Sequence, residues 1–205
     1  LVIIDGAHAP GHAPLDLTKL DADVYTGACH KWMLAPKGNS FLHVKKSLQK
    51  EIDPLIISWG YESDFPSDSQ FIDYHTYNGT KDFSAYLTIP KAIKFLKEND
   101  WEAQRKLCRT QLQHYYPIIA KELASHTLCP VNDAFLGQIC SIPIETKKPV
   151  DLKEILYNKY KIEIPIIVTK EQTYLRISFQ AYNSEKEIEY LIDCLRKIKG
   201  NGVLL

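Results

Sequence analysis

The sequence predicts an α/β protein with two units, residues 1–95 and residues 96–205. Short apolar runs rich in β-branched residues, such as LVIID at the start, indicate strands, while longer segments with apolar residues three and four positions apart indicate helices. The chain has 205 residues, 45% of them hydrophobic and 24% charged, so it can bury a core in one or two domains.

The first unit is predicted to be rich in strands. Residues 1–5 form a continuous apolar run, which is typical of a central parallel strand buried on both faces. After a loop containing Pro and Gly and a short helical turn, further strands are expected at ADVYTG and NSFLHV. Residues 52–80, rich in Ser, Asp, Tyr and Gly, predict long loops, and a helix with one apolar face follows and ends near Asn99.

The second unit is predicted to mix helices and strands. Its expected elements are a helix over 101–125, a strand over 137–144, a helix over 151–160, strands over 162–168 and 173–180, and a helix from 184. Pro117 is expected to kink or interrupt the first of these helices, because proline has no backbone N–H. Two helix starts fit the spacing of a capping box, Asp151 with Glu154 and Ser184 with Glu187.

Composition and charge argue against several classes of function. The 25 basic residues balance 25 acidic ones and form no stripe that alternates with aromatics, so nucleic acid is not an expected partner. No run of about 18 apolar residues predicts a membrane span, and no signal peptide is visible. The five scattered cysteines include no CxxC pair and predict reduced thiols in a cytoplasmic protein.

Three features far apart in the sequence suggest one kind of chemistry. Asp5 ends the first predicted strand, His30 and Lys31 follow the second, and Arg176 lies on a late strand. In open α/β sheets, ligands bind at the carboxyl ends of the strands. Lysine amines in apolar surroundings form Schiff bases with carbonyl compounds. Pyridoxal phosphate (PLP) needs such a lysine, a carboxylate for its ring nitrogen and a guanidinium for the substrate carboxylate.

Each of these residues also has a purely structural interpretation. Asp5 could cap a turn, Thr80 could be a turn residue, and Arg176 could be an edge-strand arginine paired with Glu171. The histidines that could bind zinc are His8, His12 and His30. Pro and Gly between the first two break any helix that would align them, and no carboxylate supplies a third ligand, so no metal site is expected. A metal hydrolase is kept as a further class of function.

Four segments together resemble the class V aminotransferase-type PLP enzymes, namely VIIDGAHAPGHAPLDL, DVYTGACHKWMLAPKGNSFL, YNGTKD and YLRISFQAYNSEKEIEYL. The nearest branch is the isopenicillin N epimerase-like one, and cysteine desulfurases are more distant. The resemblance implies PLP fold-type I, the aspartate aminotransferase-like fold. Residues 1–95 would be the C-terminal portion of the large, mostly parallel-sheet, PLP-binding domain, and residues 96–205 the small C-terminal α/β domain. The family's N-terminal half, with its glycine-rich phosphate-binding turn, would be absent.

The resemblance implies a role for each matching residue. Lys31 would form the Schiff base with the cofactor, Asp5 would pair with the pyridinium nitrogen, and His8 would hydrogen-bond the phenolic oxygen of the ring. His30 would contact the cofactor phosphate. Arg176 would bind the carboxylate of an amino-acid substrate.

Further positions bear on the phosphate and on assembly. Thr80 would reach the phosphate of a neighbouring subunit's cofactor, which implies a homodimer. Ala28 stands where the family usually has Ser or Asn, so one phosphate hydrogen bond is in doubt. Lys81 stands where arginine is common, which keeps the charge but loses the fork geometry.

The resemblance implies a PLP-dependent enzyme that acts at the α-carbon of an amino acid, in an epimerase-like reaction. A lyase acting on cysteine or a cysteine derivative is the alternative. Persulfide-forming desulfurases need a nucleophilic cysteine shortly before the strand that carries the arginine, and YKIEIPIIVTKEQTYLRIS contains none. A second alternative is a non-catalytic fragment that retains the fold and the dimer surface.

Overall fold

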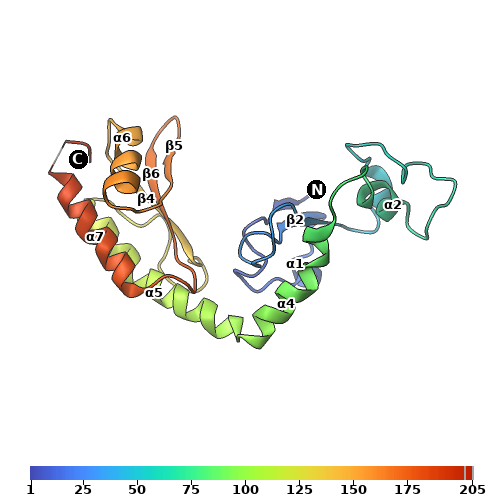
Figure 1. Cartoon of the computed structure of the whole chain (residues 1–205), viewed down its shortest axis with the longest axis horizontal. Helices are drawn as coiled ribbons and strands as arrows, with labels where there is room; N and C mark the ends of the chain where they lie inside the picture. The colour runs from blue at the N-terminus through green and yellow to red at the C-terminus, as the bar shows by residue number, and fades with distance from the viewer. Residues whose placement is uncertain (201, 205) are drawn as a thin grey trace. The chain divides into compact units, whose positions relative to one another are not determined.

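The structure, a computed structural model, describes residues 1–200 and 202–204 and divides into two compact units, Leu1–Asn99 and Asp100–Leu205 (Figure 1). Each unit combines a three-stranded sheet with helices, as expected for an α/β protein. No helix in the described part of the chain is long and apolar enough to cross a membrane.

The first unit is built on a sheet with the strand order β1-β2-β3. Its elements are β1 (Ile3–Asp5), α1 (Leu17–Leu20), β2 (Val24–Ala28), β3 (Ser40–Val44), the 3-10 helix η1 (Gln49–Glu51), α2 (Gln70–Thr76), α3 (Ser84–Leu87) and α4 (Ile89–Glu98). β1 runs parallel to β2, and β3 runs antiparallel to β2. The three predicted strands of this unit are therefore confirmed, and the helix expected before Asn99 is α4.

The expectation that the first strand is buried on both faces is wrong for this chain. Among the described strands, β1 pairs only with β2 and forms one edge of the sheet. Ile3 is 66% exposed, and Val2 before it is 55% exposed. A continuous apolar run shows that a strand is suited to a buried environment, but no second strand within the described residues pairs with the outer side of β1.

The segment over residues 52–80 is not entirely loop. It contains α2, which begins after Ser69, whose hydroxyl accepts the Ile72 N–H at 3.3 Å. Phe71 is buried on this helix, and its ring packs on His75 with centroids 4.4 Å apart. A helix of seven residues shows too little periodicity to be recognised in a polar sequence.

The second unit has an antiparallel sheet with the strand order β4-β6-β5. Its elements are α5 (Trp101–Glu122), β4 (Ile139–Ile144), α6 (Pro149–Glu154), the π-helix η2 (Ile155–Lys159), β5 (Ile166–Val168), β6 (Thr173–Ser178) and α7 (Glu185–Lys199). α5 contacts both α7 and β4, and α6 contacts β5. The large core of this unit includes the fully buried residues Leu112, Ile119, Ile142, Leu152, Leu156 and Leu175.

The last helix is built as predicted. The hydroxyl of Ser184 and the side chain of Glu187 form a capping box at its start. Its apolar stripe is buried in the core, at Ile188, Leu191, Ile192, Leu195 and Ile198. The amphipathic pattern and the cap both lie within one element, so the sequence is sufficient to define it.

Two expectations for helices of the second unit are wrong. α5 is not interrupted at Pro117, because side chains on both sides of it, such as Tyr116 and Ile119, are buried in the core and hold both halves in the helix. α6 starts at Pro149 rather than at Asp151, so the predicted Asp151 capping box does not form. Proline is favoured in the first turn of a helix, where its missing N–H is not needed.

Candidate functional site

The carboxyl ends of β1 and β2 lie next to each other in the first sheet. The strands are parallel, and Asp5 pairs with Thr26, so the segments that follow them leave the sheet at the same end. The Gly6 N–H donates to the Thr26 carbonyl at 2.9 Å. This arrangement brings the segment that begins at Asp5 together with the segment that carries His30 and Lys31.

Asp5 caps the turn that follows β1. Its Oδ1 accepts the Ala7 N–H at 3.0 Å, which is the structural role that the sequence allowed, and the side chain is exposed. The buried hydroxyl of Tyr25 donates to the Gly6 carbonyl at 3.4 Å. Burial raises the pKa of Tyr25, and the Asp5 charge raises it further. The carboxylate of Asp5 therefore lies at the end of the sheet, with one oxygen engaged in the cap.

The turn after β2 leaves Lys31 exposed and buries two of its apolar neighbours. Trp32 and Ala35 are buried, whereas Lys31 is exposed. The Leu34 N–H donates to the Lys31 carbonyl at 3.2 Å, and the Ala35 N–H donates to the Cys29 carbonyl at 3.1 Å. Trp32 and Ala35 thus form the base of the turn, and the side chain of Lys31 is exposed, contrary to the apolar surroundings expected for it.

The loop after β1 packs directly on this turn. The indole Nε1–H of Trp32 donates to Nδ1 of His8 at 3.0 Å. The ring of His12 stacks on the Trp32 ring, with centroids 4.5 Å apart. Gly11 has φ of +79°, and a Cβ at this position would collide with the Trp32 carbonyl group. The two segments are therefore joined by a hydrogen bond, a ring stack and a close backbone approach.

His30 is held by Asn39, the residue before β3. Nδ1 of His30 is 2.7 Å from the Asn39 carbonyl oxygen, which also accepts the Cys29 N–H at 3.3 Å. Asn39 is completely buried, and its Nδ2–H donates to the Ala85 carbonyl on α3 at 3.0 Å. Oδ1 of Asn39 is buried without a hydrogen-bond partner in the structure. Asn39 thus connects the turn carrying His30 and Lys31 to the start of α3.

Thr80 lies in the exposed bend before α3. Next to it, the ammonium of Lys81 is 5.1 Å from the centroid of the Tyr86 ring, within range of a cation–π interaction. Asp82 accepts the N–H and the hydroxyl of Ser84, at 2.8 and 2.9 Å, and these bonds lower the pKa of Asp82. The bend therefore has an ordered end at α3, but the described contacts do not bring Thr80 to Lys31.

Arg176 belongs to the second unit, on the central strand β6. Its Nε is buried and has no hydrogen-bond partner in the structure, and no ion pair within residues 1–200 and 202–204 joins it to Glu171. It lines a cavity of about 720 Å³ together with residues 160–165 and side chains such as Tyr182. A buried guanidinium nitrogen without an acceptor is suited to bind an anion.

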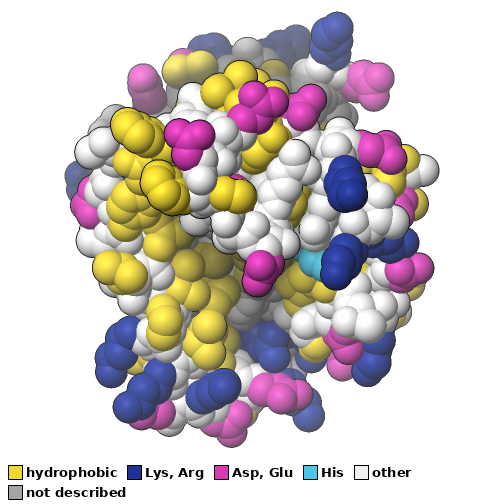
Figure 2. Space-filling view, turned by 90° about the vertical axis from the view of Figure 1, so that its right-hand side faces the viewer, with side chains coloured by type: hydrophobic (Ala, Val, Ile, Leu, Met, Phe, Trp, Pro, Cys, Tyr) yellow, Lys and Arg dark blue, Asp and Glu magenta, His cyan; other side chains and the backbone are white. Residues whose placement is uncertain are grey.

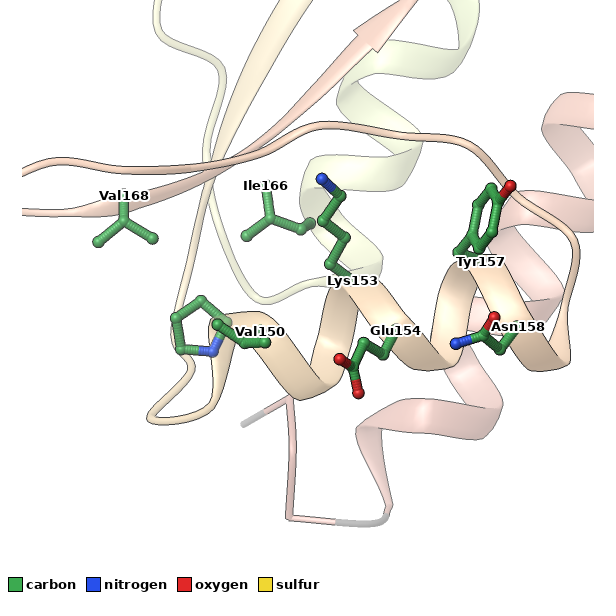
Figure 3. A pocket seen from close by; sticks show the side chains of 8 residues that line it. Val150, Lys153, Glu154, Tyr157, Asn158, Ile166 and Val168 are labelled. Atoms are coloured by element: carbon green, nitrogen blue, oxygen red, sulfur yellow. The ribbon is translucent and has the colours of Figure 1, made fainter.

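A second cavity, of about 450 Å³, lies between α6, η2 and β5 (Figure 3). Val150, Tyr157, Ile166 and Val168 supply most of its apolar lining, and Lys153 extends across it. It contains none of the residues predicted for the site. In the described part of the chain, no three His, Cys, Asp or Glu side chains gather as metal ligands.

The first unit also exposes large apolar side chains. Leu55, Trp59 and Phe65 are all more than 80% exposed. Hydrophobic patches between charged side chains are also plain in the space-filling view (Figure 2). Contiguous apolar surface is typical of a face that another polypeptide segment covers.

Two solved structures share the fold of this chain. A cysteine desulfurase from Thermococcus onnurineus NA1 superposes with a TM-score of 0.78 at 18% identity, over 97% of this chain and 52% of the desulfurase chain. A C-DES mutant with glycine covalently linked to the PLP cofactor superposes with a TM-score of 0.73 at 18% identity, over 95% of this chain and 51% of that one. The predicted PLP fold-type I is thereby confirmed.

The chain belongs to the aminotransferase class-V family, whose profile matches residues 1–191. It is 30% identical to isopenicillin N epimerase of Streptomyces clavuligerus in an alignment 210 positions long, which covers 97% of this chain and 52% of the epimerase. It is 26% identical to putative L-cysteine desulfhydrase 1 of Oryza sativa, over 98% of this chain and 46% of the relative. The chain therefore spans about half the length of these relatives.

Sequence reasoning missed Asn39 and the contact between Trp32 and His8. Asn39 stands between Gly38 and a strand, where a turn residue is the ordinary expectation. Nothing in its local pattern indicates complete burial. The only available signal was its position soon after the His-Lys pair.

Proposed function

We propose that this chain carries the cofactor lysine, the cofactor acid and the substrate arginine of a PLP-dependent enzyme that acts at the α-carbon of an amino acid. The observation that carries the proposal is the parallel pairing of β1 with β2, which brings Asp5 and the Lys31 turn to one end of the sheet. The contact of His8 with Trp32 joins the two segments there. Residues 1–95 would then be part of the PLP-binding domain, and residues 96–205 the small domain.

The donors and acceptors present fit PLP. The exposed amine of Lys31 is accessible to an aldehyde, and Asp5 has a second carboxylate oxygen for a pyridinium N–H. Because the indole of Trp32 can only donate, Nδ1 of His8 accepts, and the neutral ring carries its proton on Nε2. That nitrogen is the donor that a phenolic oxygen requires.

When bound, PLP supplies an electron sink that stabilises negative charge at the α-carbon of an amino acid. The chain's own residues would bind and orient the cofactor and the substrate, and would move protons. Nζ of Lys31 would hold the cofactor at its aldehyde carbon and would be placed to move the α-proton of the substrate. Asp5 would keep the ring nitrogen protonated. Arg176 would bind the substrate carboxylate through the guanidinium whose Nε now lacks a partner.

For the reaction we propose an epimerase-like proton transfer, supported by the similarity to isopenicillin N epimerase. A lyase acting on cysteine or a cysteine derivative is the alternative, and the similarity to a putative L-cysteine desulfhydrase favours it. The cysteines of this chain do not favour a persulfide-forming desulfurase. Burial raises the pKa of Cys140 to about 12, and Cys29 beside Lys31 is buried with a raised pKa. Thiols of this kind are poor nucleophiles at neutral pH.

We further propose a homodimer in which Thr80 contacts the phosphate of the partner subunit's cofactor. The exposure of Thr80 and of large apolar side chains such as Trp59 and Phe65 supports a covered face on this unit. A non-catalytic fragment that retains this face is the remaining alternative. An enzyme and a fragment differ in whether Lys31 reacts.

The test is covalent trapping at Lys31. The chain, alone and co-expressed with the N-terminal half of a relative, is mixed with PLP, reduced with borohydride and mapped by mass spectrometry. We expect the adduct on Lys31, its loss in Lys31→Ala, and its retention in the control Lys37→Ala, which changes another exposed lysine of the same turn region. Trapping at other lysines to the same extent in both samples would refute the proposal.

A second measurement tests Arg176. With trapping at Lys31 established, the binding of an amino acid is compared with that of its decarboxylated amine. We expect Arg176→Gln to weaken amino-acid binding by about 10- to 100-fold, as for the loss of charge-assisted hydrogen bonds, and to leave amine binding unchanged. Equal effects on both ligands would remove Arg176 from the site.

A further inference from the structure

The contact of His30 with Asn39 determines which ring nitrogen of His30 carries a proton. Nδ1 of His30 is 2.7 Å from the Asn39 carbonyl oxygen. A carbonyl oxygen can only accept a hydrogen bond, so Nδ1 must be the donor. A neutral imidazole has one N–H, and in His30 that N–H is already used. Nε2 of neutral His30 is therefore a lone pair, not a donor.

His8 and His30 thus have opposite tautomers. The ring of His8 accepts at Nδ1 from Trp32, so its neutral form has the proton on Nε2. The ring of His30 donates at Nδ1, so its neutral form has no proton on Nε2. In each ring the hydrogen-bond partner of Nδ1 determines which tautomer is present, because one ring nitrogen carries the proton that the other lacks.

Asn39 cannot move away from His30 without disturbing the fold. Its side chain is completely buried and donates to the Ala85 carbonyl, and its own carbonyl also accepts the Cys29 N–H. The next residue, Ser40, begins β3 and pairs with Ala28 of β2. Two hydrogen bonds and the strand pairing next to them therefore keep the acceptor in front of Nδ1.

We propose that Asn39 is a positioning residue which makes His30 bind the cofactor phosphate only as an imidazolium, so that phosphate binding takes up one proton. This inference rests on the proposed function, in which His30 contacts that phosphate. The proton comes from the solvent and goes to Nε2, and no covalent bond forms or breaks in this step. A phosphate dianion facing the lone pair of neutral His30 would be repelled, whereas Nε2–H of the cation donates a charge-assisted hydrogen bond.

The titratable groups around His30 belong to its own turn and to the segment that leads into α3. On its own turn its titratable neighbours are Cys29, which is buried, and Lys31, which is exposed and would bind the aldehyde. On the side of α3, Asp82 is engaged by Ser84, and the ammonium of Lys81 lies over aromatic rings. With Ala28 in place of a hydroxyl or amide donor, the phosphate would depend more strongly on His30.

The test compares PLP with pyridoxal, which has the same aldehyde but no phosphate. Binding to the chain, in the preparation that shows trapping at Lys31, is measured by calorimetry at pH 8 in two buffers of different ionisation enthalpy. The difference in proton uptake between the two ligands isolates the phosphate. We expect a difference close to one proton, and a ratio of PLP to pyridoxal affinity that falls up to about tenfold for each unit of rising pH.

Variants separate His30 from the general effect of charge. His30→Gln, which keeps a neutral N–H donor, should bind PLP with no extra proton uptake. The control His43→Gln, on β3, should behave as the parent chain. If the parent chain traps PLP at Lys31 and shows no extra uptake, the inference fails and the proposed function stands. If neither ligand is trapped at Lys31, both fail. Because the parent chain alone gives the decisive difference, the test does not depend on the folding of a variant.

Discussion

Gly11→Ala is the sharpest test of how the two segments of the site are held together. Gly11 has φ of +79°, and an added Cβ would meet the backbone carbonyl of Trp32. A left-handed backbone costs a non-glycine residue about 1–2 kcal/mol, and a less flexible unfolded chain offsets about 0.4–1 kcal/mol of this. Overpacking against a backbone group adds about 1–3 kcal/mol. We therefore expect Gly11→Ala to destabilise the first unit by about 2–4 kcal/mol.

The chain offers a matched control in Gly38→Ala. Gly38 has φ of +96°, but nothing lies within 4 Å of an added Cβ. Only the cost of the left-handed backbone and the offset from the less flexible unfolded chain apply there. Gly38→Ala should therefore lower the free energy of unfolding by only about 0.5–1.5 kcal/mol. Urea denaturation followed by tryptophan fluorescence compares the two, and borohydride trapping at Lys31 reports on the site. Equal destabilisation by the two variants, or trapping unchanged in Gly11→Ala, would contradict the packing of the loop on the turn.

Three further outcomes follow from the second unit. The guanidinium of Arg196 donates two hydrogen bonds to the Glu122 carboxylate, at 2.9 and 2.6 Å, and lowers the pKa of Glu122. The ion pair therefore stabilises the folded state above the ordinary Glu pKa of 4.5, and this stabilisation is lost as the pH falls below that value and the carboxylate is protonated. The urea midpoint of Glu122→Gln should therefore lie below that of the parent at pH 7 and approach it near pH 3. Tyr116→Phe should cost about 1–3 kcal/mol in urea denaturation, because the buried hydroxyl accepts one backbone N–H and donates to one carbonyl; no shift in the midpoint would refute this. Iodoacetamide at pH 8 should label the half-buried Cys129 well before the buried Cys140, whose pKa is about 12, and the reverse order under native conditions would reopen a nucleophilic role for Cys140.

Several elements could be predicted because their information is local. The strands that carry Asp5 and precede Lys31 are apolar runs, and α7 has both an amphipathic stripe and a capping box at Ser184. These features depend on residues a few positions apart, whose backbone bonds and side-chain contacts are decided within one element. The same logic failed at Pro117, where packing of both helix halves overrode the local preference for a break.

The site itself was only partly accessible to this reasoning. The sequence placed an acid and a lysine at strand ends, but it suggested apolar surroundings for Lys31, whereas Trp32 and Ala35 turn inward and the amine is exposed. It also did not indicate that Asn39 holds His30, since a main-chain carbonyl has no residue type to recognise.

The residue types needed for amine, acid and guanidinium chemistry, and the strands that carry them, were determined by the order of amino acids alone. The tautomers of His8 and His30, the buried bonds of Asn39 and the partnerless Nε of Arg176 were decided by folding. The physical reason is distance along the chain. Periodicity and caps act over a few residues, whereas each of these features arises where segments far apart in sequence approach within hydrogen-bonding range or exclude water from a polar atom.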